Sequence, residues 1–142
     1  MPEGTITEVL RRVPLFADAD AGALRALAEG ARPAALDAGE WLFRTGDAAD
    51  ALFVVRSGRL EVVVEGDDGP RVVRELGPGA ALGELALLTG AARSASVRAR
   101  RDSELVVLDA VAFDALTAGS ATFARGVARE LAAQLAASGG LE

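Results

Sequence analysis

Seven glycines divide the middle of this 142-residue chain into short segments, and that spacing limits the folds open to it. They stand at positions 39, 46, 58, 66, 69, 77 and 79, and Val, Leu and Phe recur between them. Short β-prone segments about ten residues apart, separated by glycine turns, are typical of an antiparallel sandwich or barrel-like roll. We therefore expect a β-roll over residues 34–108.

Within this region the sequence predicts short strands separated by turns. The expected strands cover residues 40–44, 51–55, 59–65, 71–76, 94–100 and 104–108. Residues 57–58 and 101–103 are predicted as turns between strands, and residues 66–70 as a hairpin loop.

The N-terminal end of the chain has helical spacing instead. Apolar residues at positions 6, 9, 10 and 13 predict a first helix, with Thr5 as its N-cap and Pro14 as its end. A second helix is expected between Asp20, its N-cap, and Pro33. Helices are therefore predicted over residues 5–32.

The C-terminal end is also predicted to be helical, over residues 110–137. Asp109 is the expected N-cap of one helix, a break follows at residues 119–120, and residues 138–140 end the last helix. That last helix carries one apolar stripe, formed by Phe123, Val127, Leu131 and Leu135. The length fits a single domain of residues 1–142 that is mainly β with flanking helices.

The residue types missing from the chain exclude most catalytic chemistry. It has no Cys, His, Lys, Tyr or Asn, and all 15 basic residues are Arg. Zinc or copper sites, a Ser-His-Asp triad and a Schiff-base or P-loop Lys all need one of those side chains. A hydrolase using Ser, Asp or Glu alone stays open, but we predict no catalytic residues, no metal ligands and no enzymatic activity. The net charge of −6 argues against a general nucleic-acid binder, so any bound anion must meet a local positive site.

One stretch of the β-region, residues 82–88, does not alternate like a strand. Good helix formers follow Gly83 there, which predicts a short helix inserted between strands. Arg93 follows Glu84 closely enough for the loop to bring both side chains to one pocket. A guanidinium binds phosphate through two parallel hydrogen bonds, and a carboxylate accepts from sugar hydroxyls. The chemistry of this pocket therefore indicates a nucleotide.

The same residues resemble the phosphate-binding cassette of cyclic nucleotide-binding domains. The cassette corresponds to residues 82–97, with Gly-Glu-Leu-Ala-Leu-Leu at 83–88 and Arg-Ser-Ala-Ser-Val at 93–97. Residues 38–58 resemble the first strands of that family, and Val-Pro-Leu-Phe at 13–16 resembles its opening. The resemblance covers roughly residues 8–137. It implies a jelly-roll-like double-stranded β-helix with N-terminal helices and C-terminal lid helices.

The resemblance also implies roles for individual residues. Arg93 would pair with the exocyclic oxygens of the cyclic phosphate, and Glu84 would accept the ribose 2′-hydroxyl. Backbone amides near Leu85 and Ala86 would contact phosphate or sugar, and Gly83 would allow close backbone approach. The remaining expected ligand-binding residues are Ser94, against phosphate or purine, and Ala95 and Ser96, which complete the cassette. Ala92 stands where the family usually has Pro, and that departure removes no ligand contact.

Each of these residues also has a structural interpretation. Arg93 could form an ion pair, Glu84 could favour a helix N-terminus by charge, and Ser94 and Ser96 could fill space in a strand. The apolar stripe of the last helix could be core packing or a lid over the bound base. Core positions are expected for Trp41 and Phe53. Arg98, Arg100 and Arg101 are expected to coat a solvated strand edge, with a phosphate-binding role as the second interpretation.

These observations predict a cyclic nucleotide-binding regulatory module. The expected ligand is cAMP or cGMP with no other cofactor. Ser94 stands where the family commonly has Ala with cAMP and often Thr with cGMP, so the base stays open. The heavy use of Ala and Arg, with Lys absent, suggests a GC-rich bacterial genome, and a bacterial chain favours cAMP. Ligand-induced closure of the C-terminal helix would signal to an effector domain beyond the C-terminus or to a second copy in a homodimer. The resemblance implies effectors such as channels, transporters, acyltransferases and phospholipases.

The expected location of the protein is the cytoplasm. The N-terminus lacks the features of a signal peptide, and the sequence has no run of eighteen uncharged apolar residues, so no membrane span is predicted. No DNA-binding domain is expected in this chain. The main alternative is a ligand-free structural or interaction module of the same fold, and a cupin-type dioxygenase is disfavoured by the missing His.

Overall fold

The computed structural model describes residues 3–137, with side chains for residues 6–84, 86–133 and 135–136. These residues form two compact units. One is the stretch Ala31–Ala110, and the other joins the helices that precede it to those that follow it. The expected helix end at residues 138–140 lies outside the described residues.

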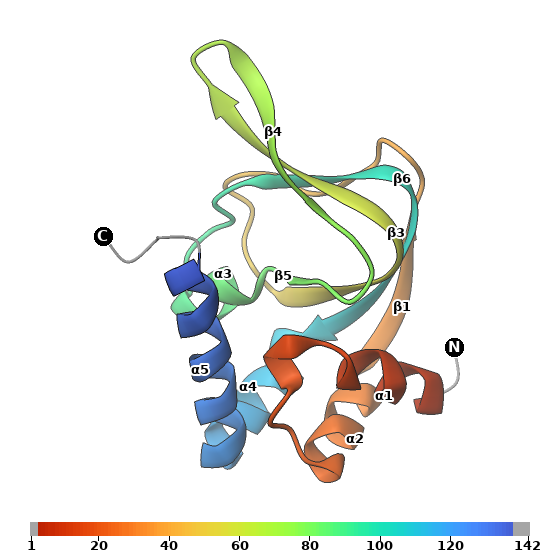
Figure 1. The fold of residues 1–142 in the computed structure, drawn as a ribbon, viewed down its shortest axis with the longest axis vertical. Helices are drawn as coiled ribbons and strands as arrows, with labels where there is room; N and C mark the ends of the chain where they lie inside the picture. Colours follow the sequence, from red (N-terminus) through yellow and green to blue (C-terminus); the bar gives the residue numbers. More distant parts are fainter. Residues whose placement is uncertain (1–2, 138–142) are drawn as a thin grey trace. The chain divides into compact units, whose positions relative to one another are not determined.

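The first unit is a six-stranded antiparallel sheet, which confirms the predicted class of antiparallel β-roll with helices at both ends of the chain (Figure 1). Its path runs β1-β6-β3-β4, with β2 paired to β6 and β5 paired to β3. The sheet does not close on itself. Its elements are β1 (Ala31–Leu36), β2 (Trp41–Phe43), β3 (Ala51–Gly66), β4 (Gly69–Leu76), β5 (Ala81–Leu82), α3 (Glu84–Thr89) and β6 (Ser96–Asp109).

Two long strands replace four of the predicted short ones. Both turns expected at residues 57–58 and 101–103 are wrong, because β3 and β6 continue through them as paired strands with shifted register. Gly58 has φ +96°, and a Cβ there would lie 2.2 Å from Ser103 Oγ. The buried Ser103 hydroxyl accepts from the Arg59 N–H (3.0 Å) and donates to the Arg101 carbonyl (2.7 Å). Where the two turns were expected, β3 and β6 instead stay paired, and the Ser103 hydroxyl occupies the space beside Gly58.

The core of the roll is built from residues two apart along β3 and β6, as expected for side chains on one face of a strand. Phe53 belongs to it, as predicted, whereas Trp41 is only half-buried. The buried members are Ala51, Phe53, Val55, Leu60, Leu76, Leu82, Val97, Ala99, Leu105 and Val107. The cluster supports the strands that carry the candidate site.

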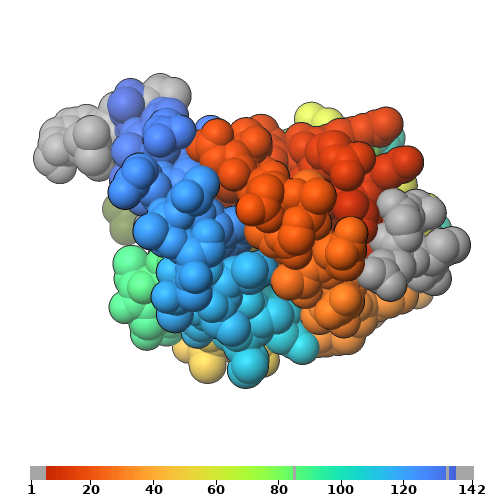
Figure 2. Space-filling view, turned by 90° about the horizontal axis from the view of Figure 1, so that it is seen from below, coloured from red at the N-terminus to blue at the C-terminus, as the bar shows by residue number. Residues whose placement is uncertain are grey.

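The second unit brings together helices from the two ends of the chain, which lie side by side in Figure 2. Phe123 stacks on Phe16 at 6.1 Å and meets Phe113 edge-on at 6.0 Å. Arg129 pairs with Asp18 (2.8 Å). The elements are α1 (Glu3–Arg11), a 3-10 turn η1 (Pro14–Phe16), α2 (Ala21–Glu29), α4 (Ala110–Gly119) and α5 (Ala121–Ala137).

The helix boundaries correct two expectations. Thr5 lies inside α1 and is not its N-cap, because the helix already begins at Glu3. Pro33 does not end α2, which stops at Glu29; it lies in β1 opposite Val106. An edge strand tolerates Pro because its outer N–H has no ladder partner. The Asp20 cap is confirmed by its bond from the Ala23 N–H (2.8 Å).

Asp109, the expected N-cap of the helix that follows it, forms an ion pair before α4. Its carboxylate pairs with Arg32 (2.7 Å). Among the described residues, none of the helices combines the length and the apolar character needed to cross a bilayer.

Candidate functional site

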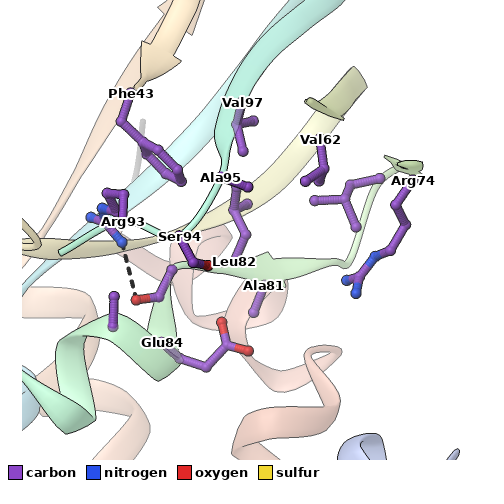
Figure 3. A pocket seen from close by; sticks show the side chains of 13 residues that line it. Phe43, Val62, Arg74, Ala81, Leu82, Glu84, Arg93, Ser94, Ala95 and Val97 are labelled. Carbon is purple, nitrogen blue, oxygen red and sulfur yellow. Dashed lines mark hydrogen bonds between the residues drawn. The ribbon is translucent and has the colours of Figure 1, made fainter. Parts of the chain in front are cut away.

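A pocket opens in the roll unit where α3 and the segment before β6 meet strands β2 to β5 (Figure 3). It contains about 650 Å³ of space free of protein atoms, part of it open to solvent. Polar and charged side chains share its wall with apolar ones. The lining residues are Phe43, Val62, Arg74, Leu76, Ala81, Leu82, Gly83, Glu84, Ala86, Arg93, Ser94, Ala95 and Val97.

Arg93 is a buried charged side chain of the pocket wall that is held by two hydrogen bonds. Only 4% of its surface is exposed, and its Nη2 donates to the Ala51 carbonyl (2.7 Å) while Nη1 donates to the Gly83 carbonyl (3.1 Å). The guanidinium lies over the Phe43 ring at 4.3 Å, a cation–π distance. No described residue accepts a hydrogen bond from its buried Nε. Arg93 therefore has a fixed position and unused donor capacity, and it is not one half of an exposed ion pair.

The backbone of Arg93 is fixed as firmly as its side chain. Its N–H donates to the Asp47 carbonyl and its carbonyl accepts from the Gly46 N–H, both at 2.8 Å. Burial lowers the pKa of Arg93, while the carboxylates of Asp50, Asp47 and Glu84 act in the opposite direction. An arginine so placed stays charged at neutral pH.

Gly83 permits the approach of Arg93. It adopts φ +89°, and a Cβ at this position would lie 2.4 Å from Arg93 Nη1. Any other residue would both strain the backbone and displace the guanidinium. The structure thus gives Gly83 a role in placing the Arg93 side chain, whereas its predicted close approach to a ligand stays a prediction.

Glu84 begins α3 and presents its carboxylate to the pocket (Figure 3). Its Oε2 is buried, and no described residue donates a hydrogen bond to it. Desolvation raises the pKa of Glu84, while its own backbone N–H and the charges of Arg74 and Arg93 lower it. The pocket therefore holds a carboxylate oxygen to which the described part of the chain supplies no donor.

Most of the predicted site residues come together here. Gly83, Glu84, Ala86, Arg93, Ser94 and Ala95 all line the pocket. Ser96 is not among the lining residues, since its Oγ accepts from the Thr45 N–H (2.9 Å). Leu85 belongs to α3, but its side chain lies outside the described residues, and Ala92 is exposed.

Five lining residues lie outside the predicted cassette: Phe43, Val62, Arg74, Leu76 and Ala81. Phe43 stacks on Arg93, and Val62 and Arg74 are register partners on β3 and β4. Only the strand register places them at the pocket. For Val62 and Arg74, the sequence offered one signal: the predicted hairpin at residues 66–70 pairs strand 59–65 with strand 71–76.

Two of the three arginines that were expected at a solvated strand edge form ion pairs with glutamates. Arg98 pairs with Glu61 (2.9 Å) and also lies over the Trp41 ring at 5.2 Å. Arg100 pairs with Glu75, whereas Arg101 is exposed. None of the three lines the pocket.

Comparison with known sequences agrees with this geometry. Residues 33–120 match the sequence pattern of the family described as "Cyclic nucleotide-binding domain". The chain belongs to this family. The expected resemblance is therefore confirmed, and the pocket lies within the matched region.

Individual relatives of this cyclic nucleotide-binding domain are much longer proteins. An uncharacterized NTE family protein of Mycobacterium bovis is 43% identical over 94 residues, which are 66% of this chain and 15% of that protein. A putative potassium channel protein of Rhodopseudomonas palustris is 34% identical over 117 residues, 82% of this chain and 28% of that protein. The chain thus spans less than a third of either relative.

A solved structure gives the same picture. The regulatory domain of Toxoplasma gondii PKA, crystallised with cAMP, matches with a TM-score of 0.76 at 34% identity, over 80% of this chain and 43% of that one. Membership of the family and this fold support a regulatory module.

Proposed function

We propose that this domain is a sensor that binds a 3′,5′-cyclic purine nucleotide in the pocket around Arg93 and Glu84. Arg93 pairs with the exocyclic phosphate oxygens, Glu84 accepts the ribose 2′-hydroxyl, and the backbone at Gly83, Leu85 and Ala86 approaches phosphate and sugar. Ser94 contacts phosphate or base, and Ala95 and Ser96 complete the cassette. No catalysis is part of this function.

The main observation in support is a pair of buried polar atoms, Arg93 Nε and Glu84 Oε2, for which the described residues offer no hydrogen-bond partner. Buried polar groups are nearly always satisfied, so one orphaned donor and one orphaned acceptor in one pocket need an explanation. A phosphate supplies the acceptor that the guanidinium lacks, and a hydroxyl supplies the donor that the carboxylate lacks. A ribose cyclic phosphate carries both groups.

Electrostatics supports the same assignment. The chain has a net charge of −6, which disfavours anions in general. Arg93 is buried, however, and its charge is therefore less screened by salt than that of a surface arginine. A small anion can bind at such a site even though the molecule as a whole repels it.

The regulatory step is a population shift. The nucleotide binds more tightly to the state in which α3 and α5 have closed and thereby favours that state. The ligand can move this equilibrium only by the ratio of its affinities for the two states. The receiver is an attached effector domain or a second copy of the chain, in the cytoplasm; the greater length of the sequence relatives supports an attached domain.

The competing proposal is a ligand-free interaction module of the same fold. Such a module has no need for an orphaned donor and an orphaned acceptor in one pocket. The sequence favoured cAMP because of an inferred bacterial origin, so the first experiment compares cAMP with cGMP.

Calorimetric titration and thermal unfolding test the proposal together. A nucleotide at a hundred times its Kd should stabilise the native state by about 2.7 kcal/mol and raise Tm by roughly 10 °C. If millimolar cAMP and cGMP both leave Tm unchanged and give no heat of binding, the domain is not a cyclic nucleotide sensor.

Variants at Arg93 locate the site. Arg93→Ala would leave the carbonyls of Ala51 and Gly83 without a donor, so the better test is Arg93→Lys, which keeps the charge and loses the planar fork. We expect at least tenfold weaker nucleotide binding. The matched control is Arg101→Lys, the same change at an exposed position of β6. Equal affinities for the two variants would place the phosphate elsewhere.

A further inference from the structure

Arg74 is a second arginine of the pocket wall, and the proposed phosphate and ribose contacts do not use it. It lies on β4, where its register partner is Val62 of β3. Figure 3 shows Arg74 and Arg93 at opposite ends of the pocket, with the Glu84 carboxylate between them. A ligand that reaches from Arg93 past Glu84 therefore meets Arg74 at its far end.

The guanidinium of Arg74 is available for a ligand. Other arginines of this sheet are held by carboxylates: Arg59 and Arg100 by Glu75, and Arg98 by Glu61. Within the part of the chain that the structure describes, Arg74 has no hydrogen bond or ion pair of this kind, and it is exposed. A ligand there would break no hydrogen bond of the described residues, although the charge of Arg74 also acts on the Glu84 carboxylate.

The order of phosphate, ribose and base in the proposed ligand determines which of these groups contacts Arg74. With phosphate at Arg93 and ribose at Glu84, the base takes the remaining end of the pocket, beside Val62 and Arg74. Val62 offers an apolar surface for a base face. The guanidinium of Arg74 offers only hydrogen-bond donors, arranged as a planar fork.

The two purines present different groups to such a fork. Guanine offers two neighbouring acceptors, N7 and O6, whereas adenine offers the N7 acceptor beside an N6 amino donor. Arginine therefore matches guanine in both positions and opposes the adenine amino group. We propose that Arg74 is a specificity-determining residue that makes this pocket prefer cGMP to cAMP. This inference rests on the proposed function, and it runs against the sequence-based preference for cAMP.

Parallel titration of cGMP, cAMP and inosine 3′,5′-cyclic monophosphate tests the inference. Inosine shares N7 and O6 with guanine and lacks the 2-amino group, so it isolates the atoms that face the fork. We expect cGMP and the inosine nucleotide to bind about 5- to 30-fold more tightly than cAMP, the lower part of the range for a bidentate arginine–guanine contact because Arg74 is exposed.

Arg74→Ala should abolish this preference by weakening the two oxo-purine nucleotides and leaving cAMP within about threefold. The matched control, Arg71→Ala, removes the same charge from an exposed position of the same strand and should keep the preference. Circular dichroism would confirm that both variants fold.

The outcomes separate the two proposals. If the unaltered domain binds cAMP as tightly as cGMP, or if Arg74→Ala weakens all three nucleotides equally, Arg74 only balances the charge of Glu84 and the inference is overturned while the proposed function stands. If none of the three nucleotides binds, the proposed function fails and the inference fails with it.

Discussion

Replacing Gly83 by Ala tests whether the position of Arg93 depends on a missing side chain. Gly83 has φ +89°, where an L-residue costs roughly 1–2 kcal/mol. The new Cβ would also lie 2.4 Å from Arg93 Nη1, which now donates to the Gly83 carbonyl at 3.1 Å. Loss of a hydrogen bond from a charged group costs about 1.5–3 kcal/mol. We expect the free energy of unfolding to fall by about 3 kcal/mol or more.

Gly39→Ala separates the two contributions. Gly39 has nearly the same conformation, φ +90°, but a Cβ at this position would meet no atom within 4 Å, so this variant should lose only the backbone cost of roughly 1–2 kcal/mol. Urea unfolding followed by circular dichroism measures both losses. Both variants should fold, because a domain of this kind typically has about 5–15 kcal/mol of stability.

Nucleotide titration of the same two variants completes the test. A displaced guanidinium should weaken binding at least tenfold in Gly83→Ala, whereas Gly39→Ala should bind like the unaltered domain. If Gly83→Ala retains full affinity and loses no more stability than Gly39→Ala, the close contact between Gly83 and Arg93 does not position the phosphate site, and the reasoning is wrong.

Two further predictions concern buried polar groups of the roll. Glu84→Gln should raise the Tm of the nucleotide-free domain at pH 7 and weaken nucleotide binding, because burial raises the pKa of Glu84 and ionising it costs stability. The native state then holds the Glu84 proton more tightly than the unfolded chain, so the stability of the unaltered domain falls as pH rises above the usual glutamate range. The Tm difference between the variant and the unaltered domain should therefore shrink on acidification. A Tm difference that does not change with pH would exclude this cause. Gly58→Ala should lose more stability in urea than Gly39→Ala, because its Cβ would lie 2.2 Å from Ser103 Oγ; equal losses would show that the bend can relax around a methyl group.

Local sequence patterns predicted much of the fold but not the continuity of its long strands. Asp20 was identifiable as a helix cap because its carboxylate needs only the next turn of backbone. Gly58 was interpreted as a turn because a glycine after Ser usually marks one. Its actual environment depends on Ser103, 45 positions further along the chain, and no local pattern contains that contact.

The residues of the candidate site also fall into two groups, those that local sequence predicted and those that only strand pairing brings to the pocket. Gly83, Glu84 and Arg93 lie within eleven residues, and their spacing with the helix formers between them was enough to predict one pocket. Phe43 and Arg74 reach that pocket only through strand pairing, and alternation alone leaves Arg74 among exposed neighbours. The sequence therefore indicated the residues proposed to contact phosphate and ribose, whereas the residues at the far end of the pocket required the register of β3 and β4.

The energetic cost of the pocket distinguishes a sensor from a docking module. Burying Arg93 Nε and Glu84 Oε2 without hydrogen-bond partners among the described residues destabilises the free domain, since each unsatisfied buried group costs about 1–3 kcal/mol or more when charged. A module that uses only its outer surface would be more stable with apolar residues at both positions. A ligand that satisfies both atoms recovers this free energy on binding, so the cost in the free state becomes affinity in the bound state. A binding site is the simplest account of why these two polar atoms are buried without partners among the described residues.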